Sequence, residues 1–167
     1  MKYTLSVIVE NCSGVLSKIS GLFSRRAFNI DSLAVGVTSN PKISRITIVT
    51  DGDEYVVEQI EKQLNKLIPV IKVKRLEEGE YIGRELLLIK VSCTSKKREE
   101  IMGIAQLVQA KIVDVSSSAV TLEYSEEVDK IILLELLRPF GIKEIVRTGK
   151  VAIEKGHGEA YHSGFND

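Results

Sequence analysis

The hydrophobic period changes in a fixed order between the N-terminus and Leu76, and this order restricts the possible folds more than any other feature. Apolar residues recur at every second position in strand-like segments and at every third or fourth position in helix-like ones. The expected segments are 3–9, 15–27, 30–38, 43–50, 54–68 and 70–76. Their order is strand, helix, strand, strand, helix, strand, which is the split βαβ arrangement of a ferredoxin-like unit.

The same order of elements returns after an acidic stretch, 77–80, which carries no apolar pattern and is assigned as a linker. Strands are expected at 86–93, 112–115, 119–124 and 142–146, and helices at 97–108 and 126–137, the latter capped by Ser125. A short extra strand over 151–153 and a loose polar tail from Lys155 complete the chain. The sequence therefore predicts an α+β protein of two ferredoxin-like βαββαβ units, with domains at 1–78 and 79–167.

The two edges expected for the first sheet differ in how well they are protected. The strand at 70–76 follows Pro69 and carries Lys72, Lys74 and Arg75, residues that keep an edge strand from pairing with another chain. The stretch 33–38 has no Lys, Arg or Pro. Because a unit of about 80 residues buries only about 60% of its unfolded surface, association is expected. We expect a homodimer in which this uncharged edge pairs with its own copy about a two-fold axis.

The polar turn 11–16 precedes the first helix, where unpaired N–H groups and the helix dipole favour a carboxylate. Gly14 lacks a Cβ, so a small ligand can approach the backbone there. In the expected dimer this turn would lie near Asn29 and Ile30 of the partner. Such a pocket would suit an aliphatic zwitterion, with its ammonium on carbonyl oxygens. The alternative reading is a plain helix cap.

Several sequence blocks within residues 1–78 together resemble the ACT domain of the small, regulatory subunit of acetolactate synthase (acetohydroxyacid synthase). They are 10–17, 21–26, 29–33, 44–45 and 58–64. The resemblance is looser from Arg84 through Gly149, although length and element order still fit. Related sequences usually have Gly where Ala27 stands. If that residue adopts a left-handed backbone, Ala costs about 1 kcal/mol or more, and the helix end that presents Asn29 changes shape.

The resemblance implies a non-catalytic subunit of branched-chain amino acid biosynthesis that activates a separate catalytic large subunit. It also implies feedback inhibition by a branched-chain amino acid, typically valine, among valine, leucine and isoleucine. The implied effector-binding residues are Asn11, Gly14, Val15 and Leu16, with Asn29 and Ile30 from the partner subunit. Gln59 matches a position linked to the feedback response, acting through helix packing. No cofactor is expected in this chain, whereas thiamine diphosphate, magnesium and FAD are expected on the catalytic partner.

Charge and composition exclude several other classes of protein. The 23 basic and 23 acidic residues give a net charge of zero, which argues against nucleic acid and anionic membranes as partners. The longest apolar runs are far below the roughly 20 residues that cross a bilayer, and no signal-type block follows Met1. Two cysteines without close Cys or His neighbours indicate free thiols in a cytoplasmic protein.

Three alternatives to the regulatory subunit were considered. An enzyme using Cys12 would need a base, but the two histidines, His157 and His162, lie in the polar tail. Those two residues fall short of the about four ligands of a structural metal site, so no metal is expected. The remaining alternative is a free-standing amino-acid sensor that regulates another enzyme or transcription. A transcription regulator would need a helix-turn-helix or a basic face, and neither is evident in the sequence.

Overall fold

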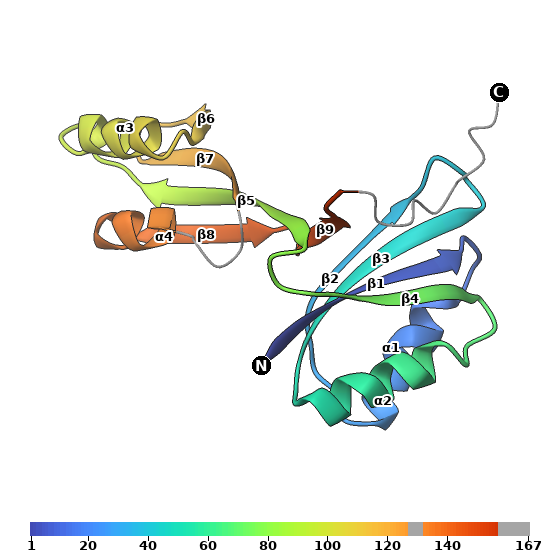
Figure 1. Cartoon of the computed structure of the whole chain (residues 1–167). Helices are drawn as coiled ribbons and strands as arrows, with labels where there is room; N and C mark the ends of the chain where they lie inside the picture. The colour runs from blue at the N-terminus through green and yellow to red at the C-terminus, as the bar shows by residue number, and fades with distance from the viewer. Residues whose placement is uncertain (127–131, 157–167) are drawn as a thin grey trace. The chain divides into compact units, whose positions relative to one another are not determined.

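The computed structural model describes residues 1–126 and 132–156, and the chain divides into two compact units. The first comprises Met1–Ile82 with the described residues from Lys150 onward, and the second is Gly83–Gly149. Each unit has a four-stranded antiparallel core sheet with two helices on one face (Figure 1). The predicted α+β class and the βαββαβ units are therefore confirmed.

The first unit orders its strands β2-β3-β1-β4, which places β2 and β4 at the edges as predicted. Its elements are β1 (Lys2–Glu10), α1 (Val15–Arg25), β2 (Ile30–Val37), β3 (Ile43–Asp51), α2 (Glu54–Leu64) and β4 (Val70–Leu76). Alternate residues of β1 and β3 pack against the apolar stripes of both helices. This core contains Leu5, Val7, Val9, Val15, Ile19, Leu22, Phe23, Ile46, Ile48, Val57, Ile60 and Leu64.

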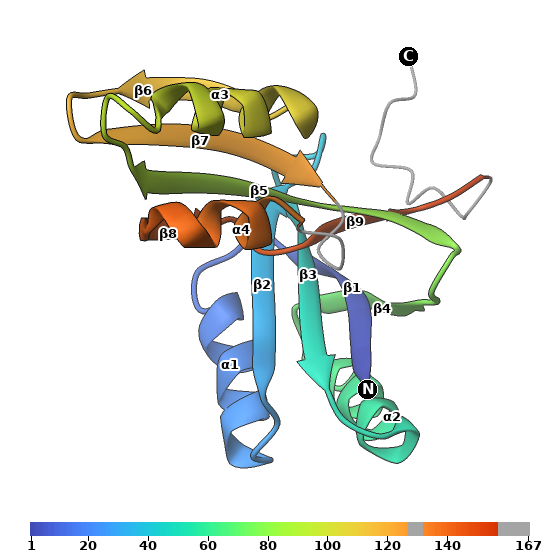
Figure 2. The ribbon, with the colours of Figure 1, turned by 90° about the vertical axis from the view of Figure 1, so that its left-hand side faces the viewer.

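The second unit repeats this plan with the strand order β6-β7-β5-β8, and Figure 2 shows both of its helices on one face of the sheet. Its elements are β5 (Tyr81–Ser92), α3 (Arg98–Leu107), β6 (Lys111–Val115), β7 (Ala119–Glu126), α4 (Ile132–Leu137) and β8 (Ile142–Arg147). The core between sheet and helices is again apolar, with Leu87, Ile89, Ile101, Leu122 and Leu133 fully buried.

Two expectations about element boundaries are wrong. Ser125 does not cap a helix that begins at Glu126, because both residues lie in β7, where they pair with Leu86 and Glu85 of β5. The pairing extends to Glu126 because β5 begins at Tyr81 rather than at residue 86. The helix α2 ends at Leu64, well before Pro69, and Ile68 is 93% exposed rather than part of the apolar stripe. The extra strand near residue 151 is confirmed as β9 (Val151–Glu154).

The C-terminal end of α1 has the geometry of a Schellman motif. Ala27 has φ 54°, its N–H donates to the Ser24 carbonyl oxygen, and the Phe28 N–H donates to the Phe23 carbonyl oxygen. The rings of Phe23 and Phe28 meet edge to face with centroids 6.3 Å apart. From the sequence, a left-handed backbone at Ala27 is expected to cost stability. Ala27 does adopt this backbone, so the helix end bears that cost. Gln109, after α3, has φ 58° in the same position of the second unit.

The segment that begins at Lys150 returns to the helix-free face of the first sheet (Figure 1). The Lys150 N–H donates to Ser32 Oγ at 2.8 Å, and its Nζ donates to the Tyr81 hydroxyl at 3.2 Å. Farther along, Lys74 Nζ donates to both carboxylate oxygens of Glu154 at 2.6 and 2.7 Å. Helices therefore cover one face of this sheet, and β9 covers part of the other.

Candidate functional site

The turn before α1 leaves the N–H groups of the first helical turn uncapped. Gly14 is the N-cap residue, with φ 83°, and no side chain among the described residues supplies a capping hydrogen bond. The first helical N–H to be paired is that of Lys18, which donates to the Gly14 carbonyl oxygen at 3.0 Å. The donors that precede it lie at the positive end of the helix dipole, so a carboxylate placed there gains both hydrogen bonds and a favourable field.

Gly14 is required at this position for two reasons. Its positive φ lies in the left-handed region, which other residues adopt only at a cost. A Cβ built at Gly14 would meet no atom within 4 Å, so the space beside its Cα is open. The sequence indicated only the second reason, close approach of a ligand. Together they make this turn an accessible, positively polarised surface.

The remaining predicted residues of the turn contribute in different ways. The exposed Asn11 is held against the turn before β3, because its Nδ2 donates to the Pro41 carbonyl oxygen at 2.8 Å. Val15 is 5% exposed and its side chain belongs to the core, so it can offer a ligand only its main chain. Leu16 is 44% exposed and can offer its side chain.

Asn29 and Ile30 lie at the opposite end of α1 from Gly14. The helix has 11 residues and therefore spans about 16 Å, so a single chain does not bring the two predicted halves of the site together. Asn29 Nδ2 donates to Asp31 Oδ1 at 2.5 Å, and the Asn29 carbonyl oxygen accepts from Thr50 Oγ1 at 2.6 Å. Ile30 packs at the margin of the core.

Sequence reasoning did not single out Asp31, which fixes the Asn29 amide and also lies 3.5 Å from Lys2 Nζ. Asp31 lies at the irregular start of β2, where the register with β3 shifts between Ile30 and Ser32, so the strand pattern gave no signal for this contact. Gln59, the position predicted to act indirectly, is half-buried on α2, the helix that lies beside α1 (Figure 1).

The edge strand β2 exposes a row of apolar side chains. Leu33, Val35 and Val37 are 37%, 46% and 59% exposed, and the register with β3 puts all three on the helix side of the sheet. No Lys, Arg or Pro interrupts β2. An unpaired strand of this kind is a template for pairing with another chain.

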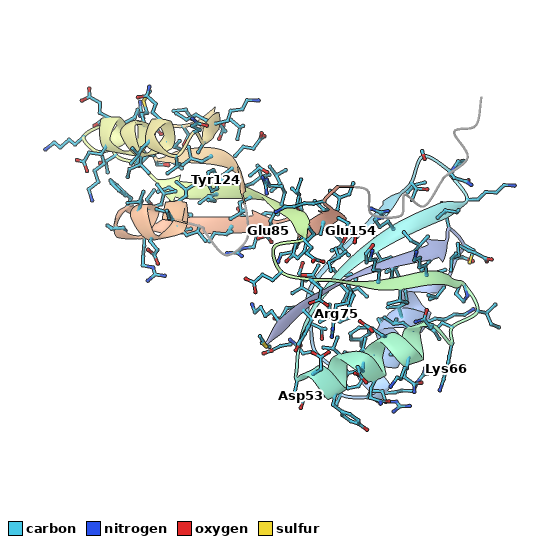
Figure 3. All side chains as sticks on the ribbon, in the orientation of Figure 1. Asp53, Lys66, Arg75, Glu85, Tyr124 and Glu154 are labelled. Atoms are coloured by element: carbon cyan, nitrogen blue, oxygen red, sulfur yellow. The ribbon has the colours of Figure 1, made fainter. Side chains whose placement is uncertain are left out.

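A polar cluster at the other edge ties α2 to β4 around Arg75 (Figure 3). Arg75 donates to the carboxylates of Glu54 and Glu77, and its hydrogen bond to Glu54 lowers the pKa of that carboxyl. Burial raises the pKa of Glu61, whose Oε1 has no hydrogen-bond partner in the part of the chain that the structure describes. The network around Arg75 is structural, since Arg75 is paired with Glu54 and Glu77.

The described ranges, 1–126 and 132–156, contain both cysteines and the Asp and Glu side chains that are candidate metal ligands. No group of three or more His, Cys, Asp or Glu side chains there could hold a metal ion. His157 and His162 lie outside these ranges. Cys12 is exposed, Cys93 is buried, and both are free. No helix among the described residues is long and apolar enough to cross a membrane.

Comparisons with known proteins agree over both units. Residues 5–72 match the family described as AHAS small subunit-like ACT domain, and residues 84–156 match the family described as small subunit of acetolactate synthase. A probable acetolactate synthase small subunit of Archaeoglobus fulgidus is 49% identical over 158 residues, which cover 94% of this chain and 99% of that protein. The acetolactate synthase small subunit of Mycolicibacterium smegmatis is 48% identical over 155 residues, which cover 92% of this chain and 91% of that protein. The crystal structure of the small subunit from Thermotoga maritima is similar with a TM-score of 0.86 at 35% identity, over 95% of this chain and 99% of that one.

Proposed function

This chain belongs to the acetolactate synthase small-subunit family, and we propose that it activates a catalytic large subunit and makes it sensitive to feedback inhibition by a branched-chain amino acid. Valine is the first candidate, and leucine and isoleucine are the others. The observation that carries this proposal is the uncapped first turn of α1 beside the open Cα of Gly14. The amino-acid carboxylate would accept from the free N–H groups of that turn.

The site is completed by a second copy of the chain. Pairing of two β2 edges about a two-fold axis would cover Leu33, Val35 and Val37 and extend the two sheets into one. It would also bring the Gly14 turn of one protomer toward Asn29 and Ile30 of its partner. Support for this arrangement comes from the unprotected β2 edge and from the distance that α1 imposes between the two halves of the site within one chain.

Inhibition would work by differential binding. An effector shifts the activity of the holoenzyme only as far as it prefers one arrangement of the regulatory dimer over another. Because the effector would lie in the seam between two protomers, its binding is coupled to how their ACT domains pair. We assign sensing and dimerisation to residues 1–78 and contact with the catalytic subunit to the remainder of the chain.

Catalysis would take place entirely in the catalytic large subunit. Thiamine diphosphate, magnesium and FAD are assigned to that partner, and this chain would hold none of them. The two free thiols are consistent with a cytoplasmic location for the complex.

Calorimetric titration of the full-length chain with valine, leucine and isoleucine tests the proposal, followed by an activity assay of the chain mixed with a catalytic large subunit. We expect heat with at least one of the three, together with activation that the same amino acid reverses. Absence of heat with all three would contradict effector binding. If an amino acid gives heat but the chain neither binds the large subunit nor changes its activity, the chain would instead be a free-standing amino-acid sensor.

A further inference from the structure

The helix-free face of the first sheet contains a cavity that the proposed effector site does not use. Its volume is about 380 Å³, within the range of about 300–1,000 Å³ typical of small-molecule sites. The walls come from β1, β2, β3 and the C-terminal strand β9, and they include Ile8, Ala34, Gly36, Arg45, Thr47 and Ala152. The predicted effector residues of the α1 turn are not part of this lining.

The hollow follows from small residues on the edge strand. In the β2–β3 register Gly36 lies opposite Arg45, and Ala34 lies opposite Thr47. Both β2 residues have small side chains, and Arg45 beside Gly36 is only half-buried, whereas Thr47 is 3% exposed. A Cβ built at Gly36 would meet no atom within 4 Å, which confirms that the space is open. Glycine in a strand interior commonly marks a place where another group approaches the backbone.

Arg45 gives the cavity its chemistry. Its side chain is half-buried, on the central strand β3, and it makes no hydrogen bond or ion pair with any described residue. A guanidinium with free N–H groups suits a carboxylate, which it can bind through two parallel hydrogen bonds. The wall on the other side of Arg45 is apolar, formed by Ile8 of β1, and Thr47 adds a hydroxyl-bearing side chain.

Among the described residues, the cavity lining contains a cation but no Asp or Glu. An amino acid would therefore place its ammonium group in the same field as the arginine, with no carboxylate to pair it. A carboxylate without an ammonium group avoids this repulsion, and a short aliphatic chain would fill the space against Ile8 and Ala152. The described lining thus offers a partner for a carboxylate and none for an ammonium group, whereas a site for a zwitterion needs both.

We propose that this cavity binds a small aliphatic monocarboxylate without an ammonium group, such as a 2-oxo acid, with its carboxylate on Arg45. Because Ala152 and Val151 form part of the wall, the ligand would hold β9 against the sheet. Ligand binding would therefore stabilise the C-terminal strand. This site is independent of the proposed effector site. A chain that binds the 2-oxo acid but none of valine, leucine and isoleucine would support the Arg45 site and contradict the proposed effector site.

The test uses two ligands with one carbon skeleton, 2-oxoisovalerate and valine, titrated calorimetrically into the full-length chain. Arg45→Met removes the cation, and Gly36→Val fills the hollow without backbone strain, since Gly36 does not have a positive φ. Lys66→Met removes one exposed cation elsewhere in the same unit and serves as the matched control. Circular dichroism establishes that each variant is folded.

We expect binding of 2-oxoisovalerate to weaken about tenfold or more in Arg45→Met and in Gly36→Val, and to be unchanged in Lys66→Met. The ligand should also slow hydrogen exchange of the amides of Val151–Glu154 in the parent chain. Absence of binding to the parent chain, or binding that Arg45→Met leaves unchanged, would overturn the proposal. Equal weakening of valine and 2-oxoisovalerate by Arg45→Met would overturn it as well, because the two ligands would then share one site.

Discussion

Two residues with a left-handed backbone flank α1, and they differ in how well their side chains suit it. Gly14 precedes the helix with φ 83°, and Ala27 follows it with φ 54°. Glycine adopts this region freely, whereas alanine does so at a cost. At the N-terminal end the chain is therefore unstrained and open to a ligand, and at the C-terminal end it stores strain in a well-formed Schellman motif.

Replacing Gly14 by Asp should abolish inhibition by the effector while activation of the catalytic subunit survives. The new carboxylate would compete with that of the amino acid for the same N–H groups. Gly79→Asp is the matched control, because Gly79 also has a positive φ, 84°, and open space beside its Cα. An activity assay with and without the amino acid distinguishes the two variants. Loss of activation together with inhibition in Gly14→Asp alone would show that the turn is needed for folding rather than for sensing.

Ala27→Gly should stabilise the chain by about 1 kcal/mol, since glycine removes the left-handed penalty and keeps the Schellman hydrogen bonds. Ala105→Gly, at a right-handed position inside α3, should instead destabilise it by about 1 kcal/mol or more. Urea unfolding measures both. A lower midpoint for Ala27→Gly than for the parent chain would contradict the account of this helix end.

Glu61→Gln should stabilise the chain near neutral pH and not in acid. Burial raises the pKa of Glu61, so the folded state binds the proton more tightly than the unfolded state does. Stability is therefore lost as the pH rises from the ordinary glutamate pKa through the raised value. Urea unfolding at about pH 7 and about pH 3.5 should show the gain only at the higher pH. Glu58→Gln, exposed and one turn away, should show no such difference, and a pH-independent gain in Glu61→Gln would refute the assignment.

At the scale of elements, the two edges of the first sheet have opposite character, and this was predictable from sequence alone. The fourth strand carries Lys72, Lys74 and Arg75, whereas residues 33–37 of β2 are uncharged and contain no Pro. The resemblance raised the question of a left-handed backbone at Ala27, and local residue types indicated the short strand β9.

Boundaries set by tertiary pairing were less predictable. Ser125 has the composition of a helix cap, but pairing with the early start of β5 keeps it in β7. Ile68 continues the apolar spacing of α2, yet the helix has already ended at Leu64. The cavity beside Arg45 had no sequence signal, since it depends on which β2 residues the register places opposite β3.

Val35→Lys on β2 should convert the proposed dimer into a monomer, because a charged side chain on an open edge disfavours pairing with a second strand. Effector binding should be lost with it, since the proposed site needs both protomers. Ile71→Lys is the matched control: Ile71 is similarly exposed, 41% against 46%, but lies on the edge that is already basic. Sedimentation velocity of the three chains measures the outcome. A Val35→Lys chain that still sediments as a dimer would exclude β2 as the seam.

At the scale of the whole molecule, the first unit is completed by residues from the far end of the chain. Helices cover one face of its sheet, and the segment from Lys150, anchored on Ser32 and Tyr81, covers part of the other. The Lys74–Glu154 ion pair adds a further contact on this face. The stability of the N-terminal unit therefore depends on residues that follow the second unit in sequence.

Ala152→Lys should destabilise the first unit by about 2 kcal/mol or more, because Ala152 is 8% exposed and the described residues of the cavity wall include the cation Arg45 but no Asp or Glu to pair the new charge. Ile153→Lys, on the alternate face of β9 and 58% exposed, should have little effect. Hydrogen exchange should quicken in β1 and β3 of Ala152→Lys and stay unchanged in α3. Unaltered protection of β1 and β3 would mean that β9 contributes nothing to the stability of this sheet.

The packing of β9 on the first unit also determines the order in which the parts of a nascent chain can fold. Gly83–Gly149 must be translated before Lys150 exists, which at about 5–20 residues per second takes roughly 3 to 13 s. Throughout that interval the N-terminal sheet on the ribosome has its helices but lacks its last strand of cover, with Ile8 and Thr47 facing outward. The unit that is translated first is thus the last to acquire all of its strands. A premature stop just before residue 150 would release an N-terminal unit that permanently lacks β9.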